Sequence, residues 1–224
     1  MKNVGKALTS SALGLVVVGL MLFLPAGTFH YWQGWVFITV FTVSTWIPSL
    51  YLTKTNPAAL ERRMHAGPLA ETRMLQRIII TFLVVCFLAT FVFSAFDHRF
   101  GWSTVPASIS LIGDVLVAVG LGVSMLVVIQ NSYAAATVNV EANQQLASTG
   151  LYGWVRHPMY TGNVIIMLGV PLALGSYWGL MFIVPGLLVL AMRIRDEEAM
   201  LNEELGGYRE YTQQVRYRLV PYVW

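Results

Sequence analysis

Charge and cysteine are both scarce in this sequence. Only 11% of its 224 residues are charged and 56% are hydrophobic, whereas soluble domains carry about 25% charged residues. This balance excludes a disordered chain, a nucleic-acid-binding protein and an ordinary soluble enzyme. The single cysteine, Cys86, excludes a disulfide framework and any multi-cysteine metal site. The four histidines lie far apart and lack metal-ligand spacing, so no metal is expected.

Long runs without any charged residue predict membrane-spanning helices. No Asp, Glu, Lys or Arg occurs in the 47 residues between Lys6 and Lys54, and one span needs only about 20 residues. Pro25, Gly27 and the polar His30 divide this run into two helices. Together with a further uncharged run and a run that is interrupted only by Asp114, it predicts that residues 1–130 form N-terminal transmembrane helices at about 8–24, 32–53, 77–97 and 106–131.

The last uncharged run predicts a helical hairpin. It extends over 36 residues from His157 to Met192. A single helix of that length would measure about 54 Å, well beyond a hydrocarbon core of about 30 Å. Because Pro171 and the stretch 175–179 interrupt the run, we expect two helices, at 160–174 and 178–194. The fold class that follows is an all-α, polytopic membrane protein with five to six transmembrane segments.

The basic residues predict how the chain lies in the membrane. If both termini are cytoplasmic, all of the 14 lysines and arginines except Arg99 fall on the cytoplasmic side, as the positive-inside rule requires. A single span over 157–192 would move five arginines to the other side, so the hairpin is preferred. The expected location is the bacterial plasma membrane if the source is prokaryotic, or the endoplasmic reticulum if it is eukaryotic.

Two clusters flank the hairpin and should meet at its open end. The segment 156–160, Arg-His-Pro-Met-Tyr, precedes it, and Arg193 with the pair Glu197-Glu198 follows it. Pro158 suits the first turn of a helix, and a helix start offers free N–H groups and a positive dipole end to a carboxylate. The two glutamates suit an ammonium or sulfonium group. Arg193 and Glu197 share a helix face.

Three other segments carry weaker indications. A polar but nearly uncharged segment over 132–156 suits a pocket that hydrogen-bonds a ligand, and its polar residues are Thr137, Asn139, Glu141, Asn143, Gln144, Gln145, Ser148 and Thr149. The basic loop 54–77 is attributed to topology and contact with lipid headgroups. In the tail, residues 195–224, we expect an amphipathic helix whose apolar residues are Met200, Leu201, Leu205 and Tyr208.

Signatures of soluble cofactor domains are missing. The sequence has no strand followed by Gly-x-Gly-x-x-Gly and no phosphate loop of the type Gly-x-x-x-x-Gly-Lys-Ser/Thr. Gly120-Leu121-Gly122 falls within a predicted membrane helix, where small residues indicate close helix packing.

The second half of the chain resembles the isoprenylcysteine carboxyl methyltransferase family. The resemblance rests on the segment 150–162, Gly-Leu-Tyr-Gly-Trp-Val-Arg-His-Pro-Met-Tyr-Thr-Gly, and on Arg193-x-x-x-Glu197-Glu198. It continues through 205–211, Leu-Gly-Gly-Tyr-Arg-Glu-Tyr, to Pro221. These motifs cover roughly the last 90 residues in the family's order and spacing. One departure is that the interval from the glutamate pair to Tyr208 is a residue shorter than is common.

The resemblance implies an integral membrane methyltransferase that uses S-adenosylmethionine and releases S-adenosylhomocysteine. Residues 131–224 would form the methyltransferase region, with a cytoplasmic C-terminal helix. Its partners would be the lipid bilayer and a lipophilic small-molecule or prenylated acceptor, methylated on a carboxylate, with no nucleic acid. Arg193 and Glu197 would be catalytic. Cofactor-binding residues would be Gln144, Gln145, Leu146, Ala147, Tyr152, His157, Pro158, Met159, Tyr160, Glu197 and Glu198.

Two alternative functions remain open. Phospholipid amine N-methyltransferases share the Pro-Met-Tyr and Glu-Glu elements and have a Gly-x-Gly comparable to 120–122; an amine acceptor would need Glu197 or Glu198 as base. An NADPH-dependent, membrane sterol-type reductase has a similar C-terminal layout and a comparable Tyr-Arg-x-x-Pro ending, here 217–221. The reductase is less favoured because residues 132–160 supply few basic groups for the NADPH phosphate.

Overall fold

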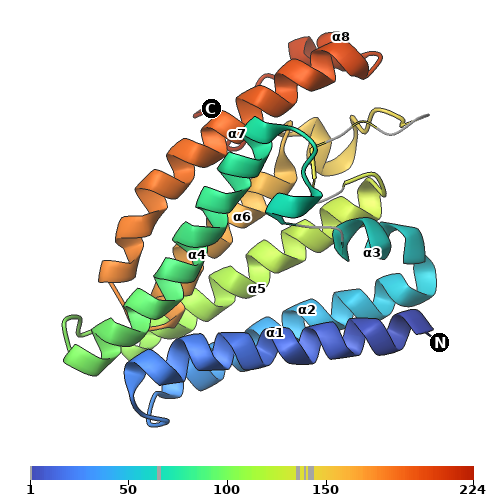
Figure 1. Ribbon diagram of the computed structural model, residues 1–224. Coiled ribbons are helices and arrows are strands. Elements are labelled where there is room, and N and C mark those ends of the chain that lie inside the picture. Colours follow the sequence, from blue (N-terminus) through green and yellow to red (C-terminus); the bar gives the residue numbers. More distant parts are fainter. Residues whose placement is uncertain (1, 65–66, 135–136, 139, 141–143) are drawn as a thin grey trace.

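The uncharged runs form long helices that pack side by side (Figure 1). The computed structural model describes residues 2–64, 67–134, 137–138, 140 and 144–224. The long helices are α1 Lys2–Ala26, α2 Trp32–Thr55, α4 Met74–Phe100, α5 Ala107–Gln130, α6 Pro158–Ala173 and α7 Ile183–Glu204. Shorter elements are α3 Pro57–Met64, η1 Pro68–Ala70, η2 Gly150–Gly153, η3 Trp178–Phe182 and α8 Tyr208–Gln214. The described residues contain no strand, which confirms the all-α prediction.

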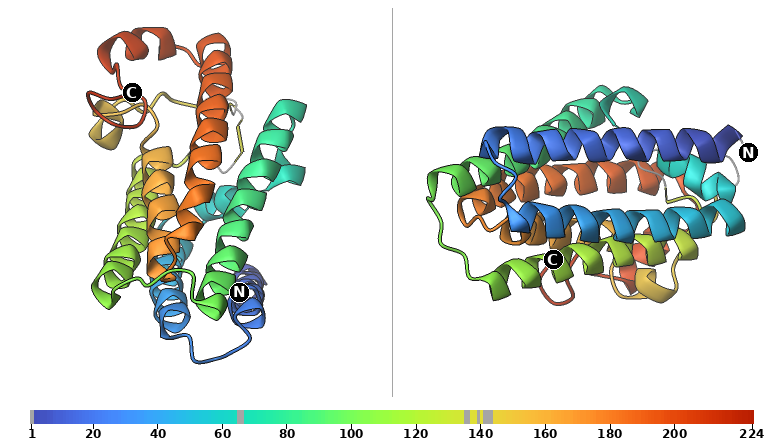
Figure 2. Two further views of the ribbon diagram at one scale, coloured as in Figure 1. Left: turned by 90° about the vertical axis from the view of Figure 1, so that its left-hand side faces the viewer. Right: turned by 90° about the horizontal axis from the view of Figure 1, so that it is seen from below.

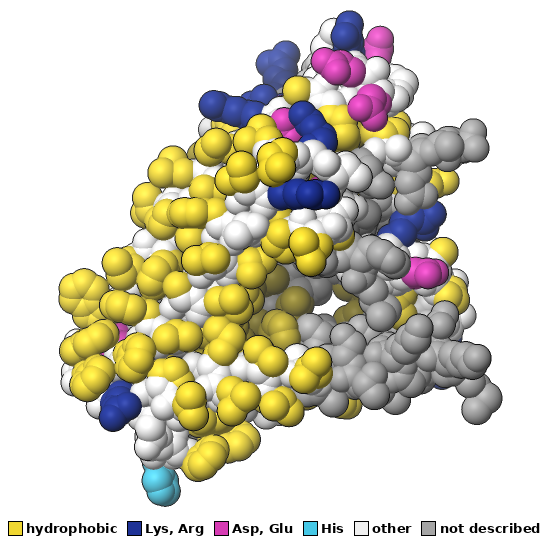
Figure 3. All heavy atoms as spheres, viewed as in Figure 1, with side chains coloured by type: hydrophobic (Ala, Val, Ile, Leu, Met, Phe, Trp, Pro, Cys, Tyr) yellow, Lys and Arg dark blue, Asp and Glu magenta, His cyan; other side chains and the backbone are white. Residues whose placement is uncertain are grey.

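The helices have the length and surface of a multi-pass membrane protein. Four described helices are long and apolar enough to cross a bilayer, and they are Trp32–Thr55, Met74–Phe100, Ala107–Gln130 and Trp178–Glu204. Leu13–Ala26 and Pro158–Ala173 are shorter apolar helices. Hydrophobic side chains cover much of the left and centre of the face seen in Figure 3, whereas the basic side chains gather mainly toward its top. A water-facing surface of this kind would be unusual, so the polytopic prediction is confirmed.

Each long helix of the bundle packs against at least one other long helix. α1 packs on α4 and α2 on α5, and both pairs can be followed in the two views of Figure 2. α4 in turn contacts α7, while α6 lies against α5. A buried apolar core, with large side chains such as Phe37 and Phe91, joins α1, α2, α4, α5 and α6.

Glycines set the close approach of α5 and α6. A Cβ on Gly120 would lie 2.6 Å from the carbonyl oxygen of Gly162, and one on Gly169 would lie 2.8 Å from that of Gly113. The two helix backbones therefore come too close for any side chain at these positions. A Cβ on Gly122, by contrast, would have no neighbouring atom within 4 Å. The close helix packing predicted for 120–122 therefore occurs at Gly120 and not at Gly122.

The predicted hairpin is present, with different boundaries. α6 begins at Pro158 and ends at Ala173, against the predicted 160–174; Pro171 lies inside it, and Gly175 after it adopts a left-handed φ of 69°. After η3, α7 continues to Glu204 rather than ending at 194. The extra turns persist because their acidic side chains find partners on neighbouring segments, such as Arg73 for Asp196.

The tail is two helices rather than one amphipathic helix. α7 ends at Glu204, and Gly207, with a φ of 81°, turns the chain before α8. Tyr208 and Tyr211 of α8 are buried against apolar side chains that include Leu146 and Leu201. This turn brings the tail onto the segment that follows α5, a contact that a straight helix would not make.

Three segments predicted to share one side of the membrane do lie at one end of the bundle. Arg73, from the basic loop, forms an ion pair of 2.8 Å with Asp196 of α7. The N–H of Val138, from the polar segment after α5, donates to Glu71 Oε2 at 3.1 Å. Which compartment this end faces stays a prediction.

Candidate functional site

A cavity of about 290 Å³ opens among these segments. It lies between the polar segment after α5, the start of α6, the outer turns of α7, and α8. Its walls include every residue that the sequence predicted for the site except Glu198, namely Gln144, Gln145, Leu146, Ala147, Tyr152, His157, Pro158, Met159, Tyr160, Arg193 and Glu197. Asn139, Glu141 and Asn143 of the predicted polar segment lie outside the described residues.

The start of α6 forms one wall of the cavity. Pro158 is the first residue of the helix and His157 caps it, as expected for a proline whose missing N–H is not needed there. The His157 and Tyr160 rings stack, with centroids 5.5 Å apart. The backbone N–H of His157 donates to the carbonyl of Arg218 at 2.9 Å. The helix start is therefore held from outside by the C-terminal segment.

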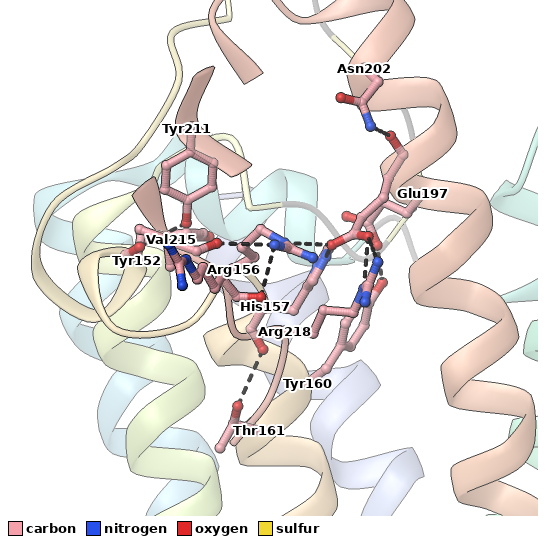
Figure 4. Close-up of polar contacts among 12 residues, drawn as sticks. Tyr152, Arg156, His157, Tyr160, Thr161, Glu197, Asn202, Tyr211, Val215 and Arg218 are labelled. Carbon is pink, nitrogen blue, oxygen red and sulfur yellow. Dashed lines mark hydrogen bonds and ion pairs between the residues drawn. The ribbon is translucent and has the colours of Figure 1, made fainter. Parts of the chain in front are cut away.

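The two clusters that flank the hairpin meet through Tyr160. Its hydroxyl donates to Glu197 Oε2 at 2.6 Å and accepts from Arg193 Nε at 2.9 Å. Figure 4 shows Tyr160 beneath Glu197 in this arrangement. Because Arg193 and Glu197 are four residues apart on α7, both reach the same hydroxyl. The predicted meeting of the basic and acidic clusters is confirmed.

Arg193 is also held by residues that the sequence reading missed. Its Nη1 donates to Gln76 Oε1 at 2.8 Å, and its Nη2 lies 2.9 Å from Glu71 Oε1. The side chains of Arg193 and Glu71 are only 4% and 1% exposed, so this is a buried ion pair. Gln76 Nε2 in turn donates to Asp196. In the sequence, Glu71 stands out only as an acidic residue within the basic loop 54–77. The basic residues of that loop indicate membrane topology, so they give no sign of a contact with Arg193.

Glu198 holds the C-terminal segment and does not line the cavity. Its carboxylate lies 2.7 Å from Arg156 Nε, 3.2 Å from His157 Nε2 and 2.8 Å from Arg218 Nη2. Arg156 Nη1 also donates to the carbonyls of Val215 and Arg216 at 3.0 and 3.1 Å. Figure 4 shows these contacts around Arg156. We name this group, Arg156, His157, Glu198 and Arg218, the C-terminal clasp.

Tyrosines line the opposite side of the cavity. Tyr211 donates its hydroxyl to the carbonyl of Tyr152 at 2.7 Å, and Asn131 donates to the Tyr152 hydroxyl at 3.1 Å. Burial raises the pKa of Tyr208, and the nearby charge of Glu198 raises it further. Burial likewise raises the pKa of Tyr152 and Tyr211. All three phenols therefore stay neutral at physiological pH and present aromatic faces that can stabilise a cation.

A second, apolar cavity of about 310 Å³ adjoins the first. It lies among α4, α6 and α7, within the apolar part of the bundle, and its walls include Phe87, Met167 and Phe182. The two cavities share Ile80, Leu83, Asn163 and Leu190 in their walls. A polar chamber therefore borders an apolar one, an arrangement that the sequence reading did not anticipate because these residues look like ordinary core.

Comparisons with known proteins bear on this half of the chain. Residues 109–207 match the family model described as phospholipid methyltransferase. Delta(14)-sterol reductase from Mus musculus is 31% identical over 93 residues, which are 39% of this chain and 22% of the reductase. The chain thus spans about a fifth of that relative's length. A solved structure of the eukaryotic intramembrane Ras methyltransferase isoprenylcysteine carboxyl methyltransferase has a TM-score of 0.47 at 16% identity, covering 97% of this chain and 86% of the other.

The matched family region contains most of the site. Residues 109–207 include the polar segment after α5, α6 and all of α7. Residues 109–207 are thus similar to a phospholipid methyltransferase model, and the described helices are long and apolar enough for a multi-pass membrane protein.

Proposed function

We propose that the protein transfers a methyl group from S-adenosylmethionine to the carboxylate of a lipid-like or isoprenylcysteine-type acceptor. The observation that carries this proposal is the pair of adjoining cavities, one polar and one apolar, with four residues common to their walls. A cofactor and a polar acceptor head fit the first, and the acceptor's apolar tail fits the second. The match to a phospholipid methyltransferase family model supports the reaction class.

The residues around the polar cavity fit such a cofactor. When bound, S-adenosylmethionine supplies an activated methyl group on a positively charged sulfur. Glu197 and the neutral faces of Tyr152 and Tyr208 would favour that charge. Gln144 to Ala147 would contact the nucleoside side of the cofactor, as the family resemblance implies. Glu198, held in the C-terminal clasp, would act on the cofactor by fixing His157 and the start of α6.

The protein's contribution to the chemistry would be mainly positioning. A carboxylate is already ionised at neutral pH, because its ordinary pKa is about 4, so no general base is needed. Holding the acceptor oxygen in line with the methyl group then provides most of the rate. Arg193 would orient the acceptor, and the contacts with Tyr160, Gln76 and Glu71 would keep its guanidinium in one position.

We also propose the membrane orientation and the division of labour predicted from the sequence. Both termini would face the cytoplasm, in a bacterial plasma membrane or in the endoplasmic reticulum. Residues 1–130 would form the membrane scaffold and 131–224 the cofactor-binding region. The scaffold is not passive in this scheme, because Glu71 and Gln76 hold Arg193.

An amine acceptor is a second candidate, favoured by the name of the matched family model. The acceptor would then be a phospholipid headgroup, and Glu197 would take its proton. The Delta(14)-sterol reductase relative keeps an NADPH-dependent reaction as a third candidate.

Binding and labelling experiments separate these candidates. Calorimetry on the detergent-purified protein should show binding of S-adenosylhomocysteine and none of NADPH. With labelled S-adenosylmethionine, the label should appear in a lipid extract as a base-labile methyl ester. A base-stable methyl in the phospholipid fraction would identify an amine acceptor instead. NADPH binding without S-adenosylhomocysteine binding would overturn the proposed reaction.

A further inference from the structure

Arg63 is a third cation in the wall of the polar cavity, and the proposed reaction does not use it. It lies on α3, which starts where the Asn56 side chain accepts a hydrogen bond of 3.1 Å from the N–H of Ala59. Ala59 is buried against α2 and α5, and Arg63 follows four residues later on the same helix face. The anchored helix thus directs Arg63 into the cavity.

The cavity's other two arginines are neutralised by the protein itself. Arg156 pairs with Glu198 at 2.7 Å, and Arg193 pairs with Glu71 at 2.9 Å. Arg63 forms no ion pair within the described part of the chain. Its Nη1 donates to the sulfur of Met159 at 2.9 Å, and a thioether is a weak acceptor.

A half-buried cation without an ion pair in the described part of the chain calls for an anion. Burial lowers the pKa of Arg63, while the neighbouring Tyr160 partly offsets the effect. An arginine nevertheless stays charged in proteins, and leaving its charge without a partner is costly. Of its five N–H donors, one donates to Met159, and the hydrogen bonds found among the described residues leave the others to a ligand. Arg156 and Arg193 each have a carboxylate partner, so among the described residues Arg63 is the arginine of the cavity wall whose charge is left to attract an anion.

The position of Arg63 indicates which anion it meets. Its contact, Met159, precedes Tyr160, the residue that joins Arg193 to Glu197. One turn further along α6 is Asn163, which belongs to the walls of both cavities. Arg63 therefore lies near the end of the polar cavity where an acceptor head would enter from the apolar one.

We propose that Arg63 binds the carboxylate of the acceptor and thereby sets the preference for an acidic head group. This inference rests on the proposed function and adds a specificity-determining residue to it. Arg193 remains the residue that orients the reacting oxygen, with its own charge already matched by Glu71.

The test compares two acceptor analogues that differ only in charge. N-acetyl-S-farnesyl cysteine and its carboxamide are titrated onto the full-length, detergent-solubilised protein saturated with S-adenosylhomocysteine. The unmodified protein should prefer the carboxylate. In Arg63→Gln, affinity for the carboxylate should fall about 10- to 100-fold, the loss expected for a charge-assisted hydrogen bond, and the two analogues should then bind equally. Lys54→Gln removes an exposed charge from the same loop and should keep the preference.

Each alternative result has a distinct meaning. A preference that survives in Arg63→Gln overturns the inference while leaving the proposed function intact. If Arg63→Gln weakens S-adenosylhomocysteine binding as much as it weakens binding of the carboxylate analogue, Arg63 holds the cofactor's carboxylate. That result also overturns the inference. No binding of S-adenosylhomocysteine by the unmodified protein refutes the proposed function itself. If Arg63→Gln does not fold, Arg63→Lys replaces it: the lost bidentate contact must weaken carboxylate binding alone, and unchanged binding rejects the inference.

Discussion

The hydroxyl of Tyr160 joins the two predicted clusters within the wall of the polar cavity. It accepts from Arg193 and donates to Glu197, so the acid and the base of α7 are fixed relative to the start of α6. Residue-level reading of the sequence identified all three side chains from their types and spacing. It missed Glu71 and Gln76, because the contact from Gln76 to Arg193 crosses 117 positions of sequence. Local sequence patterns such as helix periodicity do not predict a contact between residues that lie so far apart in the chain.

The roles of Glu197 and Arg193 can be separated by substitution. Glu197→Ala should abolish measurable S-adenosylmethionine binding in calorimetry, because the cavity loses the carboxylate that would favour the positive sulfur. Arg193→Ala should keep that binding and lose turnover at least about 100-fold, since orientation of the acceptor is lost. Glu203→Ala changes an exposed residue of the same helix and should match the unmodified protein. Full activity in Arg193→Ala would remove Arg193 from its proposed role.

At the scale of helices, the sequence predicted where the apolar segments lie and misjudged where two of them end. The ends of long apolar runs can be located from the sequence alone, so the predicted bounds of α2, α4 and α5 lie within about three residues of the observed ones. α7 extends to Glu204 because Asp196, Glu197 and Glu198 are paired with Arg73, Tyr160 and Arg156. The bend before α8 depends on the left-handed conformation of Gly207. A glycine can adopt positive or negative φ, so the sequence alone does not predict this bend.

The α5–α6 contact provides a test with a matched control. Gly120→Ala should lower stability by about 1–3 kcal/mol, because its Cβ would press on the backbone oxygen of Gly162 and force the helices apart. Gly122→Ala, two residues away, points into open space and should be neutral or slightly stabilising. Thermal unfolding in detergent measures both. Equal midpoints for the two variants would contradict this close packing of α5 on α6.

The whole molecule places the last residues of the chain against the start of α6. The C-terminal clasp surrounds Glu198 with two arginines and a histidine, and the backbone N–H groups of Arg156 and His157 donate to the carbonyls of Tyr217 and Arg218. The side chains of Arg156 and Glu198 are 7% and 8% exposed. Breaking a buried pair of this kind leaves uncompensated charge, which costs about 3–5 kcal/mol.

Loss of the clasp should therefore loosen one end of the molecule. In Glu198→Gln, amide hydrogen exchange should accelerate in residues 155–161 and 215–220, and S-adenosylhomocysteine should bind more weakly although Glu198 lies outside the cavity wall. Glu204→Gln, at the exposed end of the same helix, is the control. Unchanged exchange in Glu198→Gln would mean that the C-terminal segment is held by its other contacts.

The sequence by itself determined the all-helical membrane character and the hairpin, and it identified part of the residues that line the polar cavity. These follow from properties that are local in the chain: charge-free runs of spanning length, a proline at a helix start, and a spacing of four residues between Arg193 and Glu197. The tertiary structure alone decided which charges cancel. It pairs Arg193 with Glu71 and Arg156 with Glu198, and it gives Arg63 no ion pair among the described residues. Whether two charges compensate each other depends on the distance between them in space, and the sequence does not give the distances between helices.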